Sequence, residues 1–296
     1  MKSTRYTLQE FNTLFQDDAA CLAFIWEARG SVTCRKCSRV DKFSPVSGRR
    51  SYACICGHQE YPTAGTIYHK STTSLRSWFF AMFLMSASKN GVAALELQRQ
   101  VGVTYKTAWR MAHQIRKLMQ QGGSLLGGVV EADETYIGGK AGNMHKHKRA
   151  KLPPTGGHGK AVVLGVVERG GEVRAHVALI VNRVTVLPHT LQMVEKGAQI
   201  FTDEHSAYDL LTKAGFKHDR IAHGKGEYVR ATVHTNSIEN FWGQLKRSIN
   251  GTFHHVSPQH LQAYVNEFAF RYNHRPKIHP SPIFPVILKR VAEQHT

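Results

Sequence analysis

Three acidic residues lie where their carboxylates could bind catalytic metal ions. Asp133, in VVEADETYIGG, and Asp203, in AQIFTDEHSAY, each close an apolar run that is typical of a β-strand. Glu239, in HTNSIENFWGQLKR, lies in the first turn of a predicted amphipathic helix. Carboxylates brought together from two strand ends and a helix can hold paired Mg²⁺ ions for phosphodiester chemistry. The pattern therefore predicts an enzyme that cuts and joins DNA.

The strand around Asp133 carries two further acids. Alternation places Glu131 on the same face as Asp133 and turns Glu134 away. Two carboxylates on one face are costly unless a positive charge lies between them, and that charge is either Mg²⁺ or a Lys or Arg side chain. Pairing with Lys or Arg is a live alternative for Glu131 and a weaker one for Asp133. For Asp203, the alternative is a place at the start of a helix.

The net charge of the chain indicates a polyanionic partner. Lys and Arg number 39 against 21 acidic residues, which gives a formal charge of +18. Nucleic acid is the partner that this imbalance favours. A membrane also attracts basic proteins, but no apolar run approaches the roughly 20 residues of a spanning helix. The first residues lack the apolar core of a signal peptide. We expect a cytoplasmic protein that acts at the nucleoid.

Four cysteines predict a structural metal centre. Cys34 and Cys37 form a Cys-x-x-Cys pair, and Cys54 and Cys56 form a tighter Cys-x-Cys pair. Four thiolates from two knuckles suit tetrahedral Zn²⁺, and four protein ligands leave no open position for catalysis. His58 lies close enough in sequence to be an alternative fourth ligand. The other interpretation is a set of reduced cysteines without metal.

Two short helical patterns, at about 92–100 and 104–119, flank a turn that contains Gly102. This spacing is typical of a helix-turn-helix. The second helix carries side chains suited to phosphates and base edges, unless they simply form a solvated face. The predicted DNA-binding residues of this helix are Lys106, Thr107, Trp109, Arg110 and Arg116.

Further basic residues follow the helix-turn-helix. Lys148 and Arg149 lie in a basic, Gly- and Pro-rich loop at about 140–160. Lys246 and Arg247 lie two turns after Glu239 on the same predicted helix. We expect these four side chains to bind phosphates.

The domain organisation follows from changes of pattern along the chain. The expected class is α/β and multidomain, with small N-terminal modules followed by a mixed five-stranded sheet flanked by helices. The predicted segments are a helical lead-in at 1–30, a zinc ribbon at 31–70, a helix-turn-helix region at 71–122, a catalytic domain at 123–276 and a C-terminal tail at 277–296.

The motifs together resemble those of bacterial insertion-sequence transposases of the DDE type, in the group with an N-terminal zinc ribbon. The resemblance runs from about residue 20 to 275. The segments that carry it are ADETYIGGK, TAGTIYHKSTTSLRSWFFAMFLMSASKNGVAALELQRQVGVTYKTAWRM, FTDEHSAY, HTNSIENFWGQLKRSINGTFHHVSP and EFAFRYNHR.

The resemblance implies an RNase H-like catalytic domain in which Asp133, Asp203 and Glu239 hold two Mg²⁺ or Mn²⁺ ions. It implies cleavage at the ends of an insertion sequence and transfer of the freed ends into target DNA. The expected partners are double-stranded terminal repeats, target DNA and further copies of the chain, as a homodimer or larger oligomer. Some relatives use Asn as the third ligand, so Asn236 is an alternative to Glu239.

Two other functions fit part of the pattern. One is an RNase H-like structure-selective nuclease, which would release cut ends without joining them. The other is a DNA-binding regulator with a zinc ribbon and a helix-turn-helix, which would leave the three acids without a role.

Overall fold

The computed structural model describes residues 6–139, 142, 145–150, 160–221, 233–279 and 281–295. The chain forms two compact units: Met1–Leu118 together with Ser281–Thr296, and Met119–Pro280. Over the described ranges, none of the helices combines the length and apolar character needed to cross a membrane.

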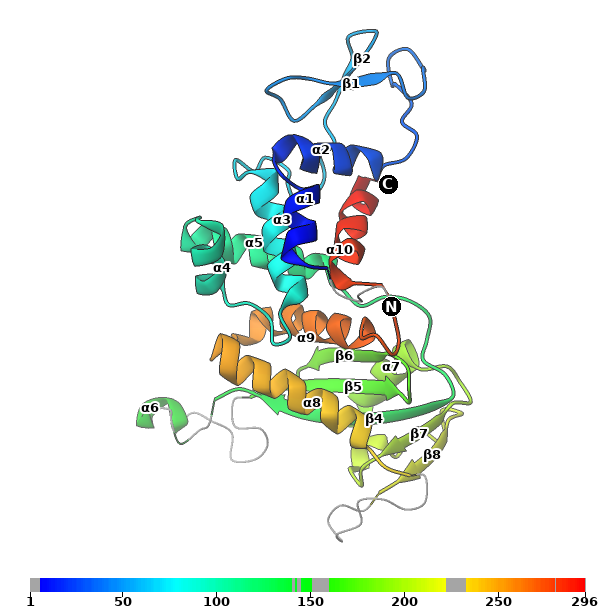
Figure 1. The fold of residues 1–296 in the computed structure, drawn as a ribbon. Coiled ribbons are helices and arrows are strands. Elements are labelled where there is room, and N and C mark those ends of the chain that lie inside the picture. Colours follow the sequence, from blue (N-terminus) through cyan, green and yellow to red (C-terminus); the bar gives the residue numbers. More distant parts are fainter. Residues whose placement is uncertain are drawn as a thin grey trace. The chain divides into compact units, whose positions relative to one another are not determined.

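The first unit is built mainly of helices (Figure 1), which pack around an aromatic core. The ring of Phe15 lies 4.9 Å from that of Phe79, 5.6 Å from Phe11 and 5.9 Å from Phe284. Aromatic rings bury much apolar area, so this cluster stabilises the unit. Its helices are α1 Leu8–Leu14, α2 Asp18–Glu27, α3 Leu75–Ala87, α4 Ala94–Val101, α5 Tyr105–Leu118 and α10 Ile283–Ala292, followed by the 3₁₀ turn η5 Glu293–His295.

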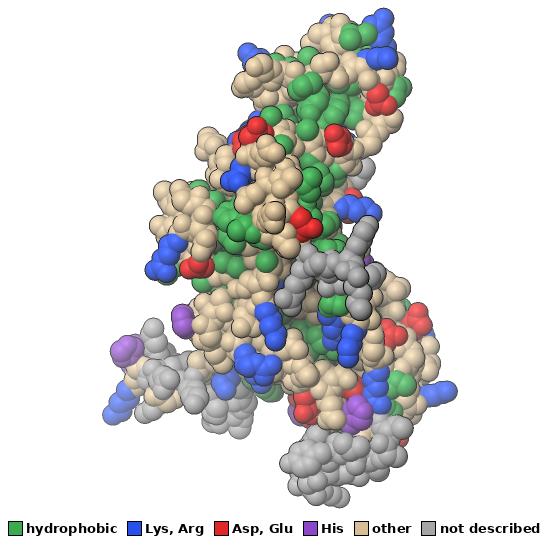
Figure 2. All heavy atoms as spheres, in the orientation of Figure 1, with side chains coloured by type: hydrophobic (Ala, Val, Ile, Leu, Met, Phe, Trp, Pro, Cys, Tyr) green, Lys and Arg blue, Asp and Glu red, His purple; other side chains and the backbone are tan. Residues whose placement is uncertain are grey.

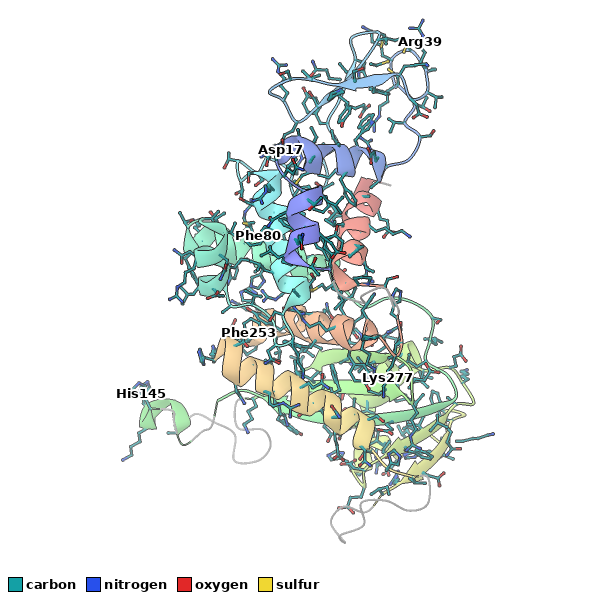
Figure 3. All side chains as sticks on the ribbon, viewed as in Figure 1. Asp17, Arg39, Phe80, His145, Phe253 and Lys277 are labelled. Carbon is teal, nitrogen blue, oxygen red and sulfur yellow. The ribbon has the colours of Figure 1, made fainter. Side chains whose placement is uncertain are left out.

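Consecutive aspartates fix the starts of two different helices. The Asp17 carboxylate, labelled in Figure 3, accepts the N–H of Ala20 at 2.8 Å and caps α2. The Asp18 carboxylate accepts the N–H groups of Leu75 and Arg76, both at 3.0 Å, at the start of α3. Carboxylates satisfy the unpaired N–H groups of a helix start and complement its dipole. Asp18 therefore joins α2 to a helix far along the sequence.

The C-terminal segment differs from the tail expected at 277–296. Residues Ile283–Ala292 form α10. This helix belongs to the first unit, although the whole second unit precedes it in the sequence. Pro282 is the N-cap and Pro285 lies in the first turn, where a missing N–H breaks no helical hydrogen bond. The prolines therefore begin the helix and do not prevent it.

The cysteine-rich segment forms a small antiparallel sheet in the order β1-β2-β3. Its strands are β1 Phe43–Pro45, β2 Tyr52–Cys54 and β3 Gln59–Glu60. The Trp26 ring of α2 stacks on Tyr52 of β2, with centroids 4.1 Å apart and planes at 8°. This stacking attaches the small sheet to the helical part of its unit.

The second unit contains a mixed five-stranded sheet in the order β6-β5-β4-β7-β8. Strands β4, β5 and β6 pair antiparallel, whereas β7 pairs parallel with β4 and β8 pairs parallel with β7. The predicted α/β class and mixed five-stranded sheet are confirmed. The sequence did not locate the edge strand β8, because its KHDR segment lacks apolar alternation. The bounds are β4 Val129–Ile137, β5 Ala161–Glu168, β6 Val173–Ala178, β7 Gln199–Thr202 and β8 Lys217–Arg220.

Helices cover both faces of this sheet. On one face, α8 Asn236–Ser248 and α9 Pro258–Asn273 share a buried apolar cluster with Val163 and Val167 of β5. On the other face, α7 Arg183–Met193 and Tyr208 pack with Leu164 and Val166. Short helical segments complete the unit: α6 Lys146–Arg149, the 3₁₀ turn η2 Ser206–Tyr208 and the π-helical turn η4 Ile249–Phe253. Phe253, labelled in Figure 3, places its ring 4.8 Å from that of Tyr264.

Two helical features of this unit differ from the expectation. The sequence pattern at about 206–214 predicts a helix, but the structure has only the 3₁₀ turn η2 there. Conversely, α7 was not predicted. Helix α7 contains Pro188 and several β-branched residues, which disfavour a helix in isolation. A capping box between Asn182 and Thr185 starts it, and burial of Val186 and Met193 stabilises it.

The edge strand β6 is closed by amide side chains. Gln121 donates to Ala175 O and accepts from Ala175 N, both at 2.7 Å. Asn273 of α9 does the same with Val173, at 3.0 and 2.8 Å. Gln262 accepts the N–H of Val177 at 2.7 Å. These amides pair the backbone groups that would otherwise invite another strand.

Candidate active site

Asp133 lies near the middle of β4, on the sheet face covered by α8. Its Oδ2 accepts a 3.0 Å hydrogen bond from Nε1 of Trp242 in α8. Glu131 contacts the start of the same helix, whereas Oε2 of Glu134 accepts from the hydroxyl of Tyr208 at 2.7 Å on the opposite face. The predicted alternation along this strand is therefore confirmed.

Asp203 follows the last residue of β7 directly. Strands β4 and β7 are parallel, with Glu131 paired to Phe201, so continuing that register by two residues brings Asp203 level with Asp133. The Asp203 Oδ1 atom accepts the N–H of His205 at 3.0 Å, which fixes the turn after the strand. The structure therefore brings the two aspartates to neighbouring positions in the sheet.

The pKa values at this point of the sheet reflect an excess of negative charge. Burial, with the Glu134 and Asp203 carboxylates adding to it, raises the pKa of Asp133 to about 8. Burial also raises the pKa of Glu134, and Asp203 adds to that effect. A bound cation would favour the ionised forms of these acids.

Glu239 lies in the first turn of α8 and is exposed. Its Oε1 accepts a 2.7 Å hydrogen bond from the hydroxyl of Thr235. Trp242, three residues later, brings this helix to Asp133. Among the described residues, however, the three acids do not form a cluster with all ligand atoms within 4.8 Å of one another; only the four cysteines do.

Asn236 is the first residue of α8 and is also exposed. The N-cap position belongs to Thr235, so Asn236 does not cap the helix. The N–H groups of the first turn bind the Glu131 carboxylate, which replaces a local cap.

The buried partners of Glu131 were only partly foreseen. Its Oε1 accepts from Arg169 Nε at 2.8 Å, so the pairing with a basic side chain considered for this acid is found. Arg169 also donates to His234 O at 2.9 Å and lies over the Phe201 ring, 4.7 Å from its centroid. The contact with α8 could not be predicted from the sequence pattern, because the partners lie more than 100 residues apart.

The four cysteines form a separate candidate metal centre in the first unit. Their sulfur atoms all lie within 4.8 Å of one another, and the Cys34–Cys56 and Cys37–Cys54 distances are both 3.6 Å. A zinc tetrahedron with bonds of about 2.3 Å places sulfur atoms about 3.8 Å apart, so the donor set fits Zn²⁺. His58 instead places Nε2 3.1 Å from the Glu60 carboxylate. The geometry favours Cys56 over His58 as the fourth ligand.

The helix-turn-helix segment has the predicted spacing. Helix α4 ends at Gly102, which has φ 74°, and Thr104 Oγ1 accepts the N–H of Thr107 at the start of α5. Lys106 and Arg110 are exposed, as is Trp109 at 37%. The Arg110 guanidinium lies 5.7 Å from the centroid of the Trp78 ring. Thr107 is half-buried.

Arg116 does not lie on the exposed face of α5. Its side chain is only 2% exposed, within a buried stripe that includes Ala112 and Ile115. The prediction that Arg116 binds DNA is therefore wrong for this conformation, since a phosphate cannot reach a buried guanidinium. A position one residue after Ile115 still belongs to the inner face of this helix.

Of the four other predicted phosphate-binding residues, only Lys246 and Arg247 have side chains among the described residues. Lys246 and Arg247 are exposed in the last turn of α8. The side chains of Lys148 and Arg149, and most of the loop at 140–160, lie outside the described residues. Figure 2 shows Lys and Arg side chains distributed over the visible face, with fewer acidic ones among them.

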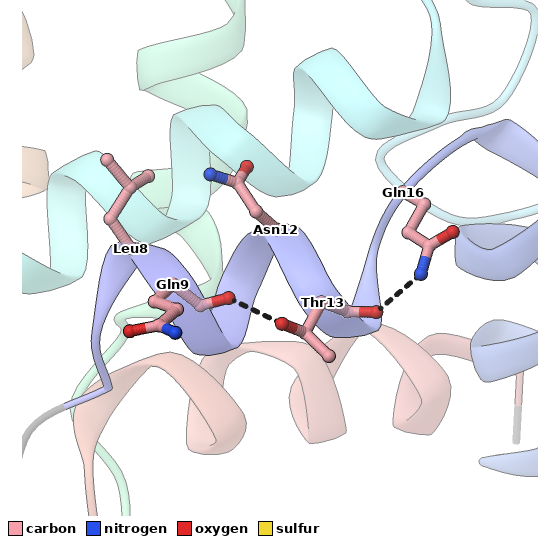
Figure 4. Close-up of a pocket in the computed structure, with 5 residues that line it drawn as sticks. All are labelled: Leu8, Gln9, Asn12, Thr13 and Gln16. Atoms are coloured by element: carbon pink, nitrogen blue, oxygen red, sulfur yellow. Dashed lines mark hydrogen bonds between the residues drawn. The ribbon is translucent and has the colours of Figure 1, made fainter.

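A surface hollow on α1 is unrelated to the acids (Figure 4). It has a volume of about 530 Å³ and is lined by Leu8, Gln9, Asn12, Thr13 and Gln16. The Thr13 hydroxyl donates to Gln9 O at 2.9 Å, and the Gln16 amide donates to Thr13 O at 3.1 Å. The described residues that line it carry no titratable side chain, so it offers no group for acid–base catalysis.

Two known proteins match this chain over much of its length. A protein of Halobacterium salinarum, described as "Uncharacterized protein in transposable element ISH50", is 27% identical over 258 residues, which cover 82% of this chain and 86% of that protein. A solved structure, the "CryoEM structure of simian T-cell lymphotropic virus intasome in complex with PP2A regulatory subunit B56 gamma", aligns over 64% of each chain at 14% identity, with a TM-score of 0.31.

A family model, the ISXO2-like transposase domain, matches residues 125–273. This range includes Asp133, Asp203 and Glu239 and spans the whole five-stranded sheet. The chain belongs to the ISXO2-like transposase family and is a transposase of an insertion sequence.

Proposed function

We propose that Asp133, Asp203 and Glu239 form the catalytic site for DNA cleavage and strand transfer. The observation that carries this proposal is the β4–β7 register, which continued by two residues places Asp203 level with Asp133, where burial and the Glu134 and Asp203 carboxylates raise the pKa of Asp133 to about 8. Acids held together at this cost are typical of functional sites. The RNase H-like assignment of the second unit rests on the same arrangement within a mixed sheet covered by helices on both faces.

The two aspartates and Glu239 would hold two Mg²⁺ or Mn²⁺ ions. Oxygen donors from carboxylates suit both metals. Such ions would supply activation of water and then of the freed 3′-hydroxyl, together with stabilisation of the leaving oxygen. Glu239 is exposed and its side chain has three rotatable bonds, and we propose that it turns toward the aspartates when metal binds.

The remaining residues of the site would hold the DNA. Lys246 lies two turns after Glu239 along α8, and Arg247 follows it. Their exposed positive charges would bind backbone phosphates beside the acids. Lys148 and Arg149 are proposed to contribute in the same way from the basic loop.

The first unit is proposed to bind the ends of the insertion sequence. The exposed residues of α5, Lys106, Trp109 and Arg110, together with Thr107, would contact the terminal repeat. One Zn²⁺ held by Cys34, Cys37, Cys54 and Cys56 would stabilise the small sheet. We propose that the active form on DNA is a dimer or larger oligomer, because two ends must be joined to one target.

A strand-transfer assay with transposon-end DNA and Mg²⁺ tests this function. Asp133→Asn and Asp203→Asn should each abolish joined products while leaving end binding unchanged, because the lost groups would hold metal and not DNA. Asp219→Asn is the matched control, since this acid lies on β8 and accepts from Gln199 at 2.7 Å. Normal joining by either site variant would show that the acids are misassigned.

The same assay separates the alternatives. Cut ends without joined products would indicate a structure-selective nuclease, and binding without cleavage would indicate a regulator. Glu239→Gln should cost far more activity than Asn236→Ala, because a carboxylate contributes charge that an amide lacks. An active Glu239→Gln beside an inactive but folded Asn236→Ala would assign Asn236 as the third ligand.

A further inference from the structure

Glu131 is a fully buried carboxylate that binds the start of α8. Its Oε2 accepts the N–H groups of Ser237 and Ile238 at 2.7 and 3.1 Å, and its Oε1 accepts from Arg169 Nε at 2.8 Å. Its exposed fraction is 0%. A buried charge is tolerated only when such donors surround it, and an anion at a helix start is favoured by the dipole. Glu131 therefore attaches β4 to α8 at one fixed point.

A second attachment lies two residues further along β4. The Asp133 carboxylate accepts the indole N–H of Trp242 at 3.0 Å. Two strand residues span roughly 6.6 Å, and the four helical residues from Ile238 to Trp242 span roughly 6 Å. Because these lengths nearly agree, a strand and a helix that run side by side can meet at both points, and Figure 1 shows α8 lying along β4 and β5.

Gly165 provides the space for the second attachment. It pairs with Asp133 across the β4–β5 ladder, and a Cβ at this position would lie 2.5 Å from Cη2 of Trp242 and 2.7 Å from Cζ2. Its backbone does not adopt the left-handed conformation that favours glycine, so the close approach of the indole is what requires it. Glycine within an apolar strand marks such an approach.

Glu239 lies between the two attachments. It comes one residue after Ile238, which binds Glu131, and three residues before Trp242, which binds Asp133. A rotation or sliding of α8 would therefore move the third proposed ligand and break one of these hydrogen bonds. The position of Glu239 relative to Asp133 is set by contacts that involve neither DNA nor metal.

We propose that Glu131 and Trp242 are positioning residues that hold Glu239 in register with Asp133, with Gly165 admitting the indole. This inference rests on the proposed function. In this proposal, Trp242 orients the Asp133 carboxylate. Glu131 fixes the position of the helix that carries Glu239.

Trp242→Phe tests the inference, because it keeps a ring over Gly165 and removes the donor to Asp133. We expect strand transfer to slow by roughly tenfold to a hundredfold, the cost of a small misplacement, with a higher Mg²⁺ concentration for half-maximal rate. End-DNA affinity should not change. Trp78→Phe is the matched control, because Trp78 is also buried and its indole donates to Ser71 Oγ at 2.9 Å in the first unit. It should leave the Mg²⁺ dependence unaltered.

Glu131→Gln and Gly165→Ala extend the test. Both should raise the Mg²⁺ concentration for half-maximal rate, as Trp242→Phe does. If either variant fails to fold, the result for Trp242→Phe alone tests the inference. A folded Trp242→Phe protein with the wild-type rate and Mg²⁺ dependence would overturn the inference. Asp133→Asn, run alongside, separates the two failures: if it still joins DNA, the proposed site is wrong, whereas if it is inactive while Trp242→Phe is normal, only the positioning role is wrong.

Discussion

Asp133→Asn should stabilise the metal-free protein while abolishing its activity. The pKa of Asp133 rises from its ordinary value of 3.8 to about 8, first through burial and then through the Glu134 and Asp203 carboxylates. The folded state therefore binds this proton more tightly than the unfolded state. Ionised Asp133 opposes folding, and asparagine removes that charge with nearly the same volume.

The size of the effect follows from the pKa. One pKa unit corresponds to about 1.4 kcal/mol, so the shift sets an upper bound of about 6 kcal/mol on the destabilisation by ionised Asp133. Relaxation and water reduce such values, and the Trp242 indole loses a charged acceptor in the variant. We expect a net gain of about 1 to 3 kcal/mol at pH 8, or roughly 3 to 9 °C in the melting temperature of this unit.

The raised pKa also determines how the stability difference between the variant and the wild type changes with pH. Below about pH 4 Asp133 is protonated in both states and costs nothing, and the penalty grows as pH rises through the folded pKa near 8. Without added Mg²⁺, the melting temperature of Asp133→Asn should therefore rise relative to that of the wild type between pH 5 and pH 8. A chelator is avoided because it would also remove zinc. Added Mg²⁺ should raise the melting temperature of the wild type more than that of the variant.

Asp209→Asn is the matched control with the opposite sign. Hydrogen bonds and charge from Arg220 and Arg183 lower the pKa of Asp209, so its carboxylate favours folding above the ordinary pKa. That stability is lost as pH falls through the lowered pKa, and Asp209→Asn should lower the melting temperature at neutral pH. If Asp133→Asn also destabilised the protein at pH 8, the electrostatic reasoning for the site would be refuted.

Two further predictions concern zinc binding and DNA binding. Elemental analysis should find about one zinc per chain, and Cys34→Ser with Cys37→Ser should remove it and weaken end binding, because the small sheet has too little core to fold alone; a metal-free wild type that binds its ends normally would contradict this. Lys106→Ala or Arg110→Ala should lower the preference for end sequence over random DNA by about 1 to 3 kcal/mol, whereas Lys246→Ala with Arg247→Ala should weaken all DNA binding equally and reduce its salt dependence. Binding curves at several salt concentrations distinguish the two classes, and equal behaviour would show that α5 does not read sequence.

Features encoded by short segments could be predicted from the sequence. The cysteine pairs, the turn at Gly102 and the apolar strands around Asp133 and before Asp203 each carry their signal within a few residues. The strand around Asp133 continues to Ile137, however, so this residue does not close it as expected. Periodicity also placed Glu131 and Asp133 on one face. It failed for Arg116, because an isolated helix pattern gives no measure of how wide the buried stripe is.

Features that depend on distant partners could not be predicted. Helix α10 begins with prolines and is held by the Phe11 and Phe15 rings, which lie at the other end of the chain. Strand β8 is polar because it lies at an edge, and its pairing with β7 alone defines it. Tertiary packing overrides local propensity in each case.

The helix that carries Glu239 shows why the third acid was the hardest to place. Its start is stabilised by Glu131, more than 100 residues earlier, and Thr235 makes no side-chain cap hydrogen bond to it. Asp18 stabilises the start of α3 in the same long-range manner. Remote carboxylates thus attach the starts of these two helices to distant parts of the fold, whereas a local cap would bond only to the adjacent residues of the chain. For α8 this means that the strand bearing Asp133 also determines where Glu239 lies, so the geometry of the proposed site is built into the β4–α8 contact before DNA arrives.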